Sequence, residues 1–145
     1  MLVELLGNRA VVVPLTASII AQLSKFLLYW LVRRRRDFRY LVAPGGMPSA
    51  HSAFVAGLAF VIGEEQGLGS VAFALALALA IIVMYDAAGV RRAMSHQARI
   101  LNQILDEIFA GHPVSEQRVR ELIGHTPFEV LVGSALGIFL AWLWP

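Results

Sequence analysis

Four apolar runs constrain this chain more than any other feature. They cover residues 10–32, 48–62, 68–85 and 127–144, and short polar stretches separate them. Runs of 18 to 23 residues can cross the hydrocarbon core of a bilayer as helices. The second run is shorter and would cross only by tilting or by local thinning of the membrane. We therefore expect an all-α integral membrane bundle with about four transmembrane helices, forming a single domain over residues 1–145.

The composition supports a membrane protein. Residues of the hydrophobic set make up 58% of the chain, charged residues make up 15%, and cysteine is absent. An ordinary soluble domain is about 25% charged, a disordered chain is poor in apolar residues, and a disulfide-stapled secreted module needs paired cysteines. No basic region precedes the first apolar run, so we expect this run to be retained rather than cleaved as a signal peptide.

The loops predict an orientation. The connection between the first two runs holds five arginines at positions 33–36 and 39, whereas the next connection holds Glu64 and Glu65 and no base. The positive-inside rule places the arginine-rich loop in the cytoplasm, with both termini outside and residues 91–126 on the cytoplasmic side. The basic residues cluster between apolar runs instead of following a soluble face, so no nucleic-acid partner is expected.

The longest polar stretch contains a predicted amphipathic insertion. Apolar residues recur at helical spacing over residues 96–110, with polar residues between them. This pattern predicts a helix on the cytoplasmic membrane surface. Gly111, His112 and Pro113 interrupt it, and residues 115–123 predict a second short interfacial helix with Ser115 as its N-cap.

A polar stripe runs through the first apolar segment. Ser18, Gln22, Lys25 and Tyr29 follow one another at steps of four, three and four, so they share one helical face. Such a face must contact protein or water, and an ionisable residue in a span is a candidate functional residue. Lys25 is either such a residue or a cation that snorkels to the interface.

The second feature is the segment from Gly45 to Ser52, where a glycine pair leads into a helix start. The N-terminus of a helix offers unpaired N–H groups and partial positive charge to a phosphate, and His51 beside it could donate a proton to a leaving oxygen. The other interpretation is a glycine-rich loop with Pro48 in the first turn, a serine cap and an incidental histidine. For this segment alone, the second interpretation is the stronger.

The third feature is the segment from Gly124 to Glu129, where His125 and Glu129 lie four residues apart at another helix start. A carboxylate behind an imidazole holds its tautomer and stabilises its positive form. A purely structural pair that staples the helix start is the alternative.

Further candidates lie at the end of the third run and in the fourth. Arg91 and Arg92 are either topological anchors or a fork for phosphate oxygens. Gly133 and Gly137 form a G-x-x-x-G spacing that predicts close helix packing and also fits a homodimer contact. His96 and His112 lack a metal-ligand spacing, so no metal and no cofactor are expected. The polar residues predicted at the cytoplasmic helix ends are Lys25, Ser49, His51, Asp86, Arg91, Arg92, His125 and Glu129, and they point to an anion site suited to phosphoryl transfer.

Three stretches, residues 45–53, 85–92 and 124–130, resemble the type-2 phosphatidic acid phosphatase and haloperoxidase superfamily, closely its divergent acid-phosphatase-like membrane branch. Lys25 matches the lysine of that pattern and His125 matches its nucleophile. Several positions differ from the pattern. Ala50 stands for the glycine of Pro-Ser-Gly-His, Glu129 stands for aspartate, Val32 and Arg33 stand where Arg-Pro is usual, and Arg91 or Arg92 stands for the arginine of Ser-Arg.

The resemblance implies a metal-independent membrane phosphatase that hydrolyses a lipid phosphate monoester of the phosphatidylglycerol phosphate, phosphatidate or prenyl phosphate class. His125 would form a phosphohistidine, Glu129 would orient it, and His51 would protonate the leaving alkoxide. The remaining residues expected to bind substrate are Lys25, Gly46, Ser49, Asp86, Arg91 and Arg92. The alternative is a catalytically silent membrane protein that binds phospholipid head groups or a partner protein.

Overall fold

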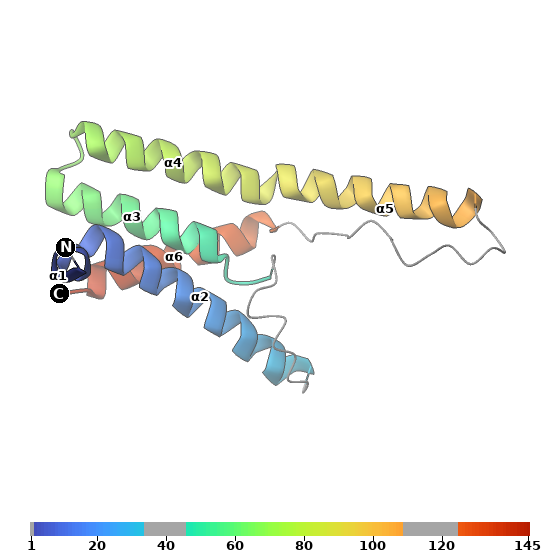
Figure 1. Ribbon diagram of the computed structural model, residues 1–145, viewed down its shortest axis with the longest axis horizontal. Coiled ribbons are helices and arrows are strands. Elements are labelled where there is room, and N and C mark those ends of the chain that lie inside the picture. Colours follow the sequence, from blue (N-terminus) through green and yellow to red (C-terminus); the bar gives the residue numbers. More distant parts are fainter. Residues whose placement is uncertain (1, 34–45, 109–124) are drawn as a thin grey trace.

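The computed structural model describes residues 2–33, 46–108 and 125–145, and every regular element within these ranges is a helix (Figure 1). The elements are α1 (Leu2–Gly7), α2 (Arg9–Arg33), α3 (Ala50–Gln66), α4 (Val71–Ala88), α5 (Val90–Ile108) and α6 (Pro127–Leu143). The four apolar runs correspond to α2, α3, α4 and α6, which confirms the predicted helical class.

Two helices in the described ranges are long and apolar enough to cross a membrane: α2 over Arg9–Leu31 and α4 over Val71–Ala88. The apolar helix α6 is slightly shorter. Helix α3 extends beyond its predicted end, so Glu64 and Glu65 lie in its last turns instead of in a loop. A membrane helical bundle is therefore plausible, and the number of four crossings stays a prediction.

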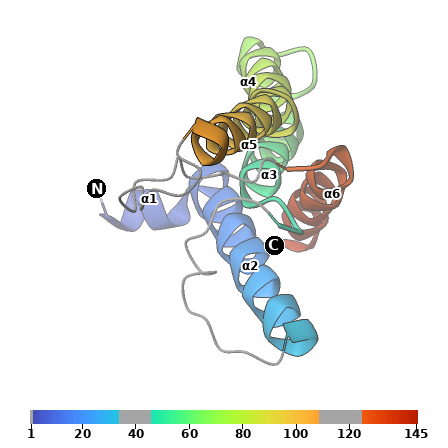
Figure 2. The same ribbon diagram turned by 90° about the vertical axis from the view of Figure 1, so that its right-hand side faces the viewer.

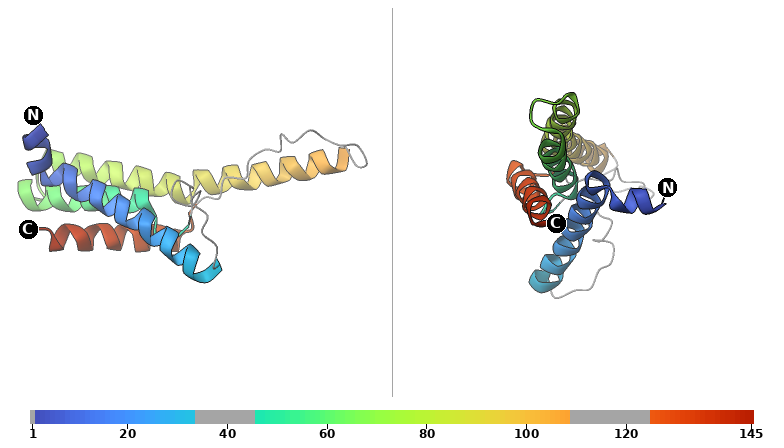
Figure 3. Two further views of the ribbon diagram at one scale, coloured as in Figure 1. Left: turned by 60° about the horizontal axis from the view of Figure 1, so that its bottom comes forward. Right: turned by 90° about the vertical axis from the view of Figure 1, so that its left-hand side faces the viewer.

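The helices alternate in direction, so that one end of the bundle collects all the helix ends relevant to the predicted site. Helices α2 and α4 end there, and α3 and α6 begin there, whereas both chain termini lie at the opposite end (Figures 1 and 3). Helix α3 occupies the centre and packs against α2, α4 and α6 (Figure 2).

Small residues bring α3 and α6 into close contact. A Cβ atom added to Gly133 would collide with the backbone of Ser49, and one added to Gly137 would collide with the backbone of Ala53. Lipid tails are as apolar as the helix side chains, so this kind of close backbone approach is a main source of helix association in a membrane. The predicted packing role of Gly133 and Gly137 is confirmed.

The proline near each helix start at the site occupies a different position relative to its helix. Pro127 is the first residue of α6, as predicted, because the missing N–H of proline has no helical partner at that position. Pro48 was predicted in a first turn, and this prediction is wrong. Ser49 has extended backbone angles and is the N-cap of α3, so Pro48 precedes the helix.

Helix α5 begins at Val90, six residues before the predicted start, and continues the direction of α4 beyond the end of the bundle (Figure 1). A helix on the membrane surface would run across that direction, so an interfacial position would require a bend near Gly89. The interfacial location stays a prediction. The arginine-rich loop at residues 34–39 and the short helix predicted at residues 115–123 lie outside the described residues.

Candidate functional site

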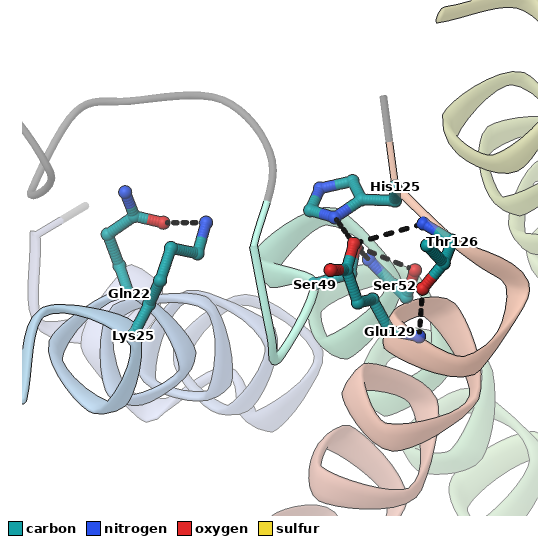
Figure 4. A network of polar contacts seen from close by, with 7 residues as sticks. All are labelled: Gln22, Lys25, Ser49, Ser52, His125, Thr126 and Glu129. Carbon is teal, nitrogen blue, oxygen red and sulfur yellow. Dashed lines mark hydrogen bonds and ion pairs between the residues drawn. The ribbon is translucent and has the colours of Figure 1, made fainter. Parts of the chain in front are cut away.

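The candidate site lies where α3 and α6 begin, and its centre is the pair formed by His125 and Glu129 (Figure 4). The Nδ1 atom of His125 lies 3.2 Å from Oε2 of Glu129. The His125 side chain is 2% exposed, and that of Glu129 is 20% exposed. The spacing of four residues thus places the imidazole and the carboxylate in contact, as the sequence predicted.

A capping box fixes the carboxylate of Glu129. Its Oε2 atom accepts a hydrogen bond from the backbone N–H of Thr126 at 3.0 Å, and Oγ1 of Thr126 accepts one from the backbone N–H of Glu129 at 3.3 Å. Thr126 was not predicted to have a role, although Thr-x-x-Glu at a helix start is the signature of this motif. Glu129 therefore fits both interpretations, the structural staple and the partner of the imidazole, since the same carboxylate caps α6 and contacts the ring of His125.

The contact with Glu129 distinguishes the two ring nitrogens of His125. An ionised carboxylate only accepts hydrogen bonds, so opposite such a carboxylate Nδ1 is the donor. The second ring nitrogen points away from Glu129 (Figure 4). This is the arrangement that a nucleophilic histidine needs.

Ser49 joins the start of α3 to α6. Its backbone N–H donates to the carbonyl of Glu129 at 3.1 Å, and its Oγ accepts from the backbone N–H and the hydroxyl of Ser52 at 3.3 and 2.9 Å. Both serines are fully buried. The N–H of Ser49 is thus used within the protein, so the first-turn N–H groups of Ala50 and His51 are the better candidates for phosphate oxygens. Ser52 was not predicted as a site residue.

Lys25 approaches the site from α2. Its side chain is 6% exposed, and its Nζ atom donates to Oε1 of Gln22 at 3.1 Å. The Glu129 carboxylate lies close enough to interact with the ammonium electrostatically. Ser18 and Tyr29 of the same stripe are partly buried. The stripe therefore faces protein, which favours the functional interpretation of Lys25 over the snorkelling one.

At Gly46 the segment before α3 packs against the side chain of Lys25. Its φ angle is +82°, a left-handed conformation that glycine adopts readily, and a Cβ atom there would lie 3.2 Å from Cδ of Lys25. In Figure 4 the Gln22–Lys25 pair and the His125–Glu129 pair lie on either side of this segment. Gly46 therefore positions the segment against the lysine stem.

The junction of α4 and α5 also reaches the site. The carbonyl of Ala87 accepts a hydrogen bond from the N–H of His125 at 3.1 Å. Asp86 is partly buried one residue earlier. Arg91 and Arg92 lie in the first turn of α5, within five residues of Ala87, and their side chains are outside the described part of the chain.

Not all of the histidines considered from the sequence are buried at this end of the bundle. His51 lies in the first turn of α3 and is exposed, as is His96 on α5. Gly45, His112 and Gly124 lie outside the described residues. Within the described ranges, no group of three His, Cys, Asp or Glu residues could hold a metal ion.

The residues that the structure gathers are Lys25 on the second half of α2, Gly46 and Ser49 before α3, and His125 and Glu129 at the start of α6. They combine an imidazole, a carboxylate in contact with it, and a buried cation. Such a combination suits a substrate group that is itself anionic.

Comparisons with known proteins agree with this reading. A sequence profile described as "Divergent PAP2 family" matches residues 6–140. The chain is also similar to the uncharacterized membrane protein YuiD of Bacillus subtilis (strain 168), with 36% identity over 148 residues that cover 94% of each protein. No solved structure gives a significant match.

Proposed function

Since the chain belongs to the Divergent PAP2 family, we propose that it is a membrane phosphatase that hydrolyses a lipid phosphate monoester through a phosphohistidine intermediate. The observation that carries the proposal is the contact of 3.2 Å between the buried His125 and the largely buried Glu129, with the Lys25 ammonium within electrostatic range. A structural staple would need the carboxylate but not the buried lysine.

In the first step, Nε2 of His125 attacks phosphorus, and an N–P bond forms as the bond from phosphorus to the lipid oxygen breaks. Glu129 stabilises the positive charge that develops on the ring. His51 donates a proton to the leaving alkoxide, a role that an exposed side chain at the start of α3 can fill.

In the second step, water attacks the phosphohistidine. His51 accepts a proton from this water, the N–P bond breaks, and inorganic phosphate and neutral His125 are released. Lys25, with Arg91 or Arg92, neutralises the phosphoryl oxygens in both transition states, because guanidinium and ammonium groups are the side chains that stabilise such charge.

The proposal includes a multi-pass location with the site on the cytoplasmic face. Two helices of spanning length and the description of the Bacillus relative as a membrane protein support a membrane location, and the arginine-rich loop supports the orientation. The chain lacks cysteine, so a cysteine introduced at Arg36 would report its own position. Labelling of that cysteine by an impermeant reagent in intact cells would contradict the orientation.

The test is phosphate release by detergent-purified protein from phosphatidate, phosphatidylglycerol phosphate and a prenyl phosphate, in the presence of a metal chelator. We expect His125→Ala to lower release from the preferred substrate by about 10³-fold or more. The control is His96→Ala, which changes an exposed histidine on α5 and should leave release unchanged.

Release that survives His125→Ala would rule out the phosphohistidine mechanism. Tight binding of these lipids by the wild-type protein without any phosphate release would instead favour a head-group-binding protein.

A further inference from the structure

An apolar groove of about 510 Å³ lies between α3, α4 and α6. Its wall on α4 consists of Phe73, Leu77, Ala80 and Met84, which recur every three or four residues and so form one continuous stripe. The remaining lining residues are mostly apolar too, apart from Glu64 at one end of the groove and Ser134 at the other.

The Ser134 end of the groove adjoins the candidate site. The hydroxyl of Ser134 lies 3.0 Å from Sδ of Met84 and donates to the carbonyl of Val130 at 2.9 Å. Val130 follows Glu129, and Met84 precedes by three residues the Ala87 carbonyl that holds the N–H of His125. At a rise of about 1.5 Å per residue, the groove therefore begins about 4.5 Å from Ala87 along α4 and about 7.5 Å from Glu129 along α6.

The dimensions of the groove fit one hydrocarbon chain. From Phe73 to Met84 the helix rises by about 17 Å. A bilayer core of about 30 Å consists of two leaflets, so one lipid chain reaches about 15 Å. The groove volume is also within the range of ligand sites, and the hydroxyl of Ser134 is already bonded to backbone, so the lining favours an apolar occupant.

We infer that this groove holds one acyl chain of the lipid whose phosphate is processed at His125. This inference rests on the proposed function and specifies its substrate class. The protein selects phosphate monoesters that carry a long hydrocarbon chain over short-chain or water-soluble phosphate esters. The apolar lining and the continuity with the site support this occupant over a second protein chain.

The first test blocks the groove and compares dipalmitoyl with dihexanoyl phosphatidate. Leu77→Trp fills the groove, and Leu79→Trp is the matched control, since the two leucines are 42% and 45% exposed on the same helix and only Leu77 lines the groove. We expect Leu77→Trp to lower kcat/KM for the long-chain substrate by about tenfold or more, because the lost contacts amount to at least two methylene groups.

For dihexanoyl phosphatidate, Leu77→Trp should leave kcat/KM unchanged, and Leu79→Trp should change neither substrate. Equal losses with both substrates, or with both variants, would overturn the inference.

The second test locates the chain without using activity. A palmitoyl phosphatidate with a diazirine at the end of one acyl chain is photolysed with the wild-type protein. We expect label on the groove residues of α3 and α4 near Gly63 and Phe73, and loss of this label with excess dipalmitoyl phosphatidate but not with dipalmitoylglycerol. Equal displacement by both lipids would show bulk lipid in the groove, and cross-linked dimers would show a second copy. Either outcome would overturn the inference.

The two proposals fail in different ways. Phosphatidate-specific labelling of the groove in a protein that releases no phosphate would disprove the phosphatase activity but support the acyl-chain site in the groove. Phosphate release without dependence on chain length, with label elsewhere, would disprove the groove and keep the phosphatase.

Discussion

At the end of the bundle that carries both termini, Arg9 ties three helices together. One of its terminal nitrogens donates to Oε2 of Glu64 at 3.3 Å and to the carbonyl of Trp144 at 3.2 Å, and the other lies 3.8 Å from Glu65. The three charged side chains are about one third exposed. Arg9 therefore contacts carboxylates directly, and these ion pairs are partly exposed to solvent.

At the opposite end the charges are more deeply buried and are arranged differently. Lys25 bonds to the neutral amide of Gln22, and the carboxylate of Glu129 contacts His125 and the cap of α6. Lys25 and Glu129 influence each other electrostatically, yet their described hydrogen bonds go to other groups.

The difference fits a structural role for the Arg9 cluster and the proposed functional role for the group at the other end. A partly exposed ion pair contributes at most about 1 kcal/mol and joins helix ends. A buried ammonium costs stability unless a partner of opposite charge is present, and ionisable groups kept inside a membrane bundle are typically functional. An anionic substrate would add negative charge next to Lys25, beyond that of Glu129.

The largest effect is expected for Glu129→Gln, which separates the two roles of this side chain. Oε2 of Glu129 contacts both the N–H of Thr126 and Nδ1 of His125, so a glutamine oxygen can keep both contacts and the cap persists, but the negative charge beside the ring is lost. We expect phosphate release to fall by about 10³-fold, because that charge stabilises the positive charge that develops on the ring. Thermal unfolding in detergent should hardly change.

Thr126→Ala is the control for Glu129→Gln, because it removes the cap and keeps the carboxylate. It should cost about 1 kcal/mol of stability. If Glu129→Gln retains activity, the pair is a staple like the Arg9 cluster.

The next effect is expected for Lys25→Met, compared with Arg9→Met at the other end. Lys25→Met should lower kcat/KM by about 10²-fold, since it removes one donor for the phosphoryl oxygens. It should leave stability unchanged or raise it, because a buried charge is replaced by an apolar side chain. Arg9→Met should leave kcat/KM unchanged and lower stability by less than about 1 kcal/mol. Similar effects of both variants on activity would show that the two ends do not differ as argued.

The smallest effect is expected for Gly137→Ala, which tests the close helix contact shared by both ends. The added Cβ would collide with the carbonyl of Ala53, so α3 and α6 must move apart. We expect a loss of about 2 kcal/mol in the free energy of unfolding, measured by thermal or denaturant unfolding in detergent. Gly69→Ala is the control, since a Cβ there meets no atom within 4 Å. Equal stability of the two variants would contradict the packing role.

Much of the site could be predicted from the sequence because its pairs are local. His125 and Glu129 lie four residues apart on either side of the N-cap of α6, and the polar stripe that contains Lys25 follows from helical periodicity. The serine cap at the start of α3 was predicted, but the bond from Ser49 to Glu129 and the packing of Gly46 on Lys25 could not be, because each joins residues more than 20 positions apart along the chain. The position of Pro48 outside α3 was mispredicted because serine competes successfully for the cap.

The sequence by itself determined the helices, their apolar character and the contact between His125 and Glu129, since run length and residue spacing act over short stretches of the chain. Only the tertiary structure decided that Gly46 packs on Lys25, that Ser49 bonds to Glu129, and that His125 bonds to Ala87. It also decided that an apolar groove begins beside the site. These features depend on how closely α3 and α6 approach and on where α4 ends, and such distances arise from packing between elements that no spacing along the chain encodes.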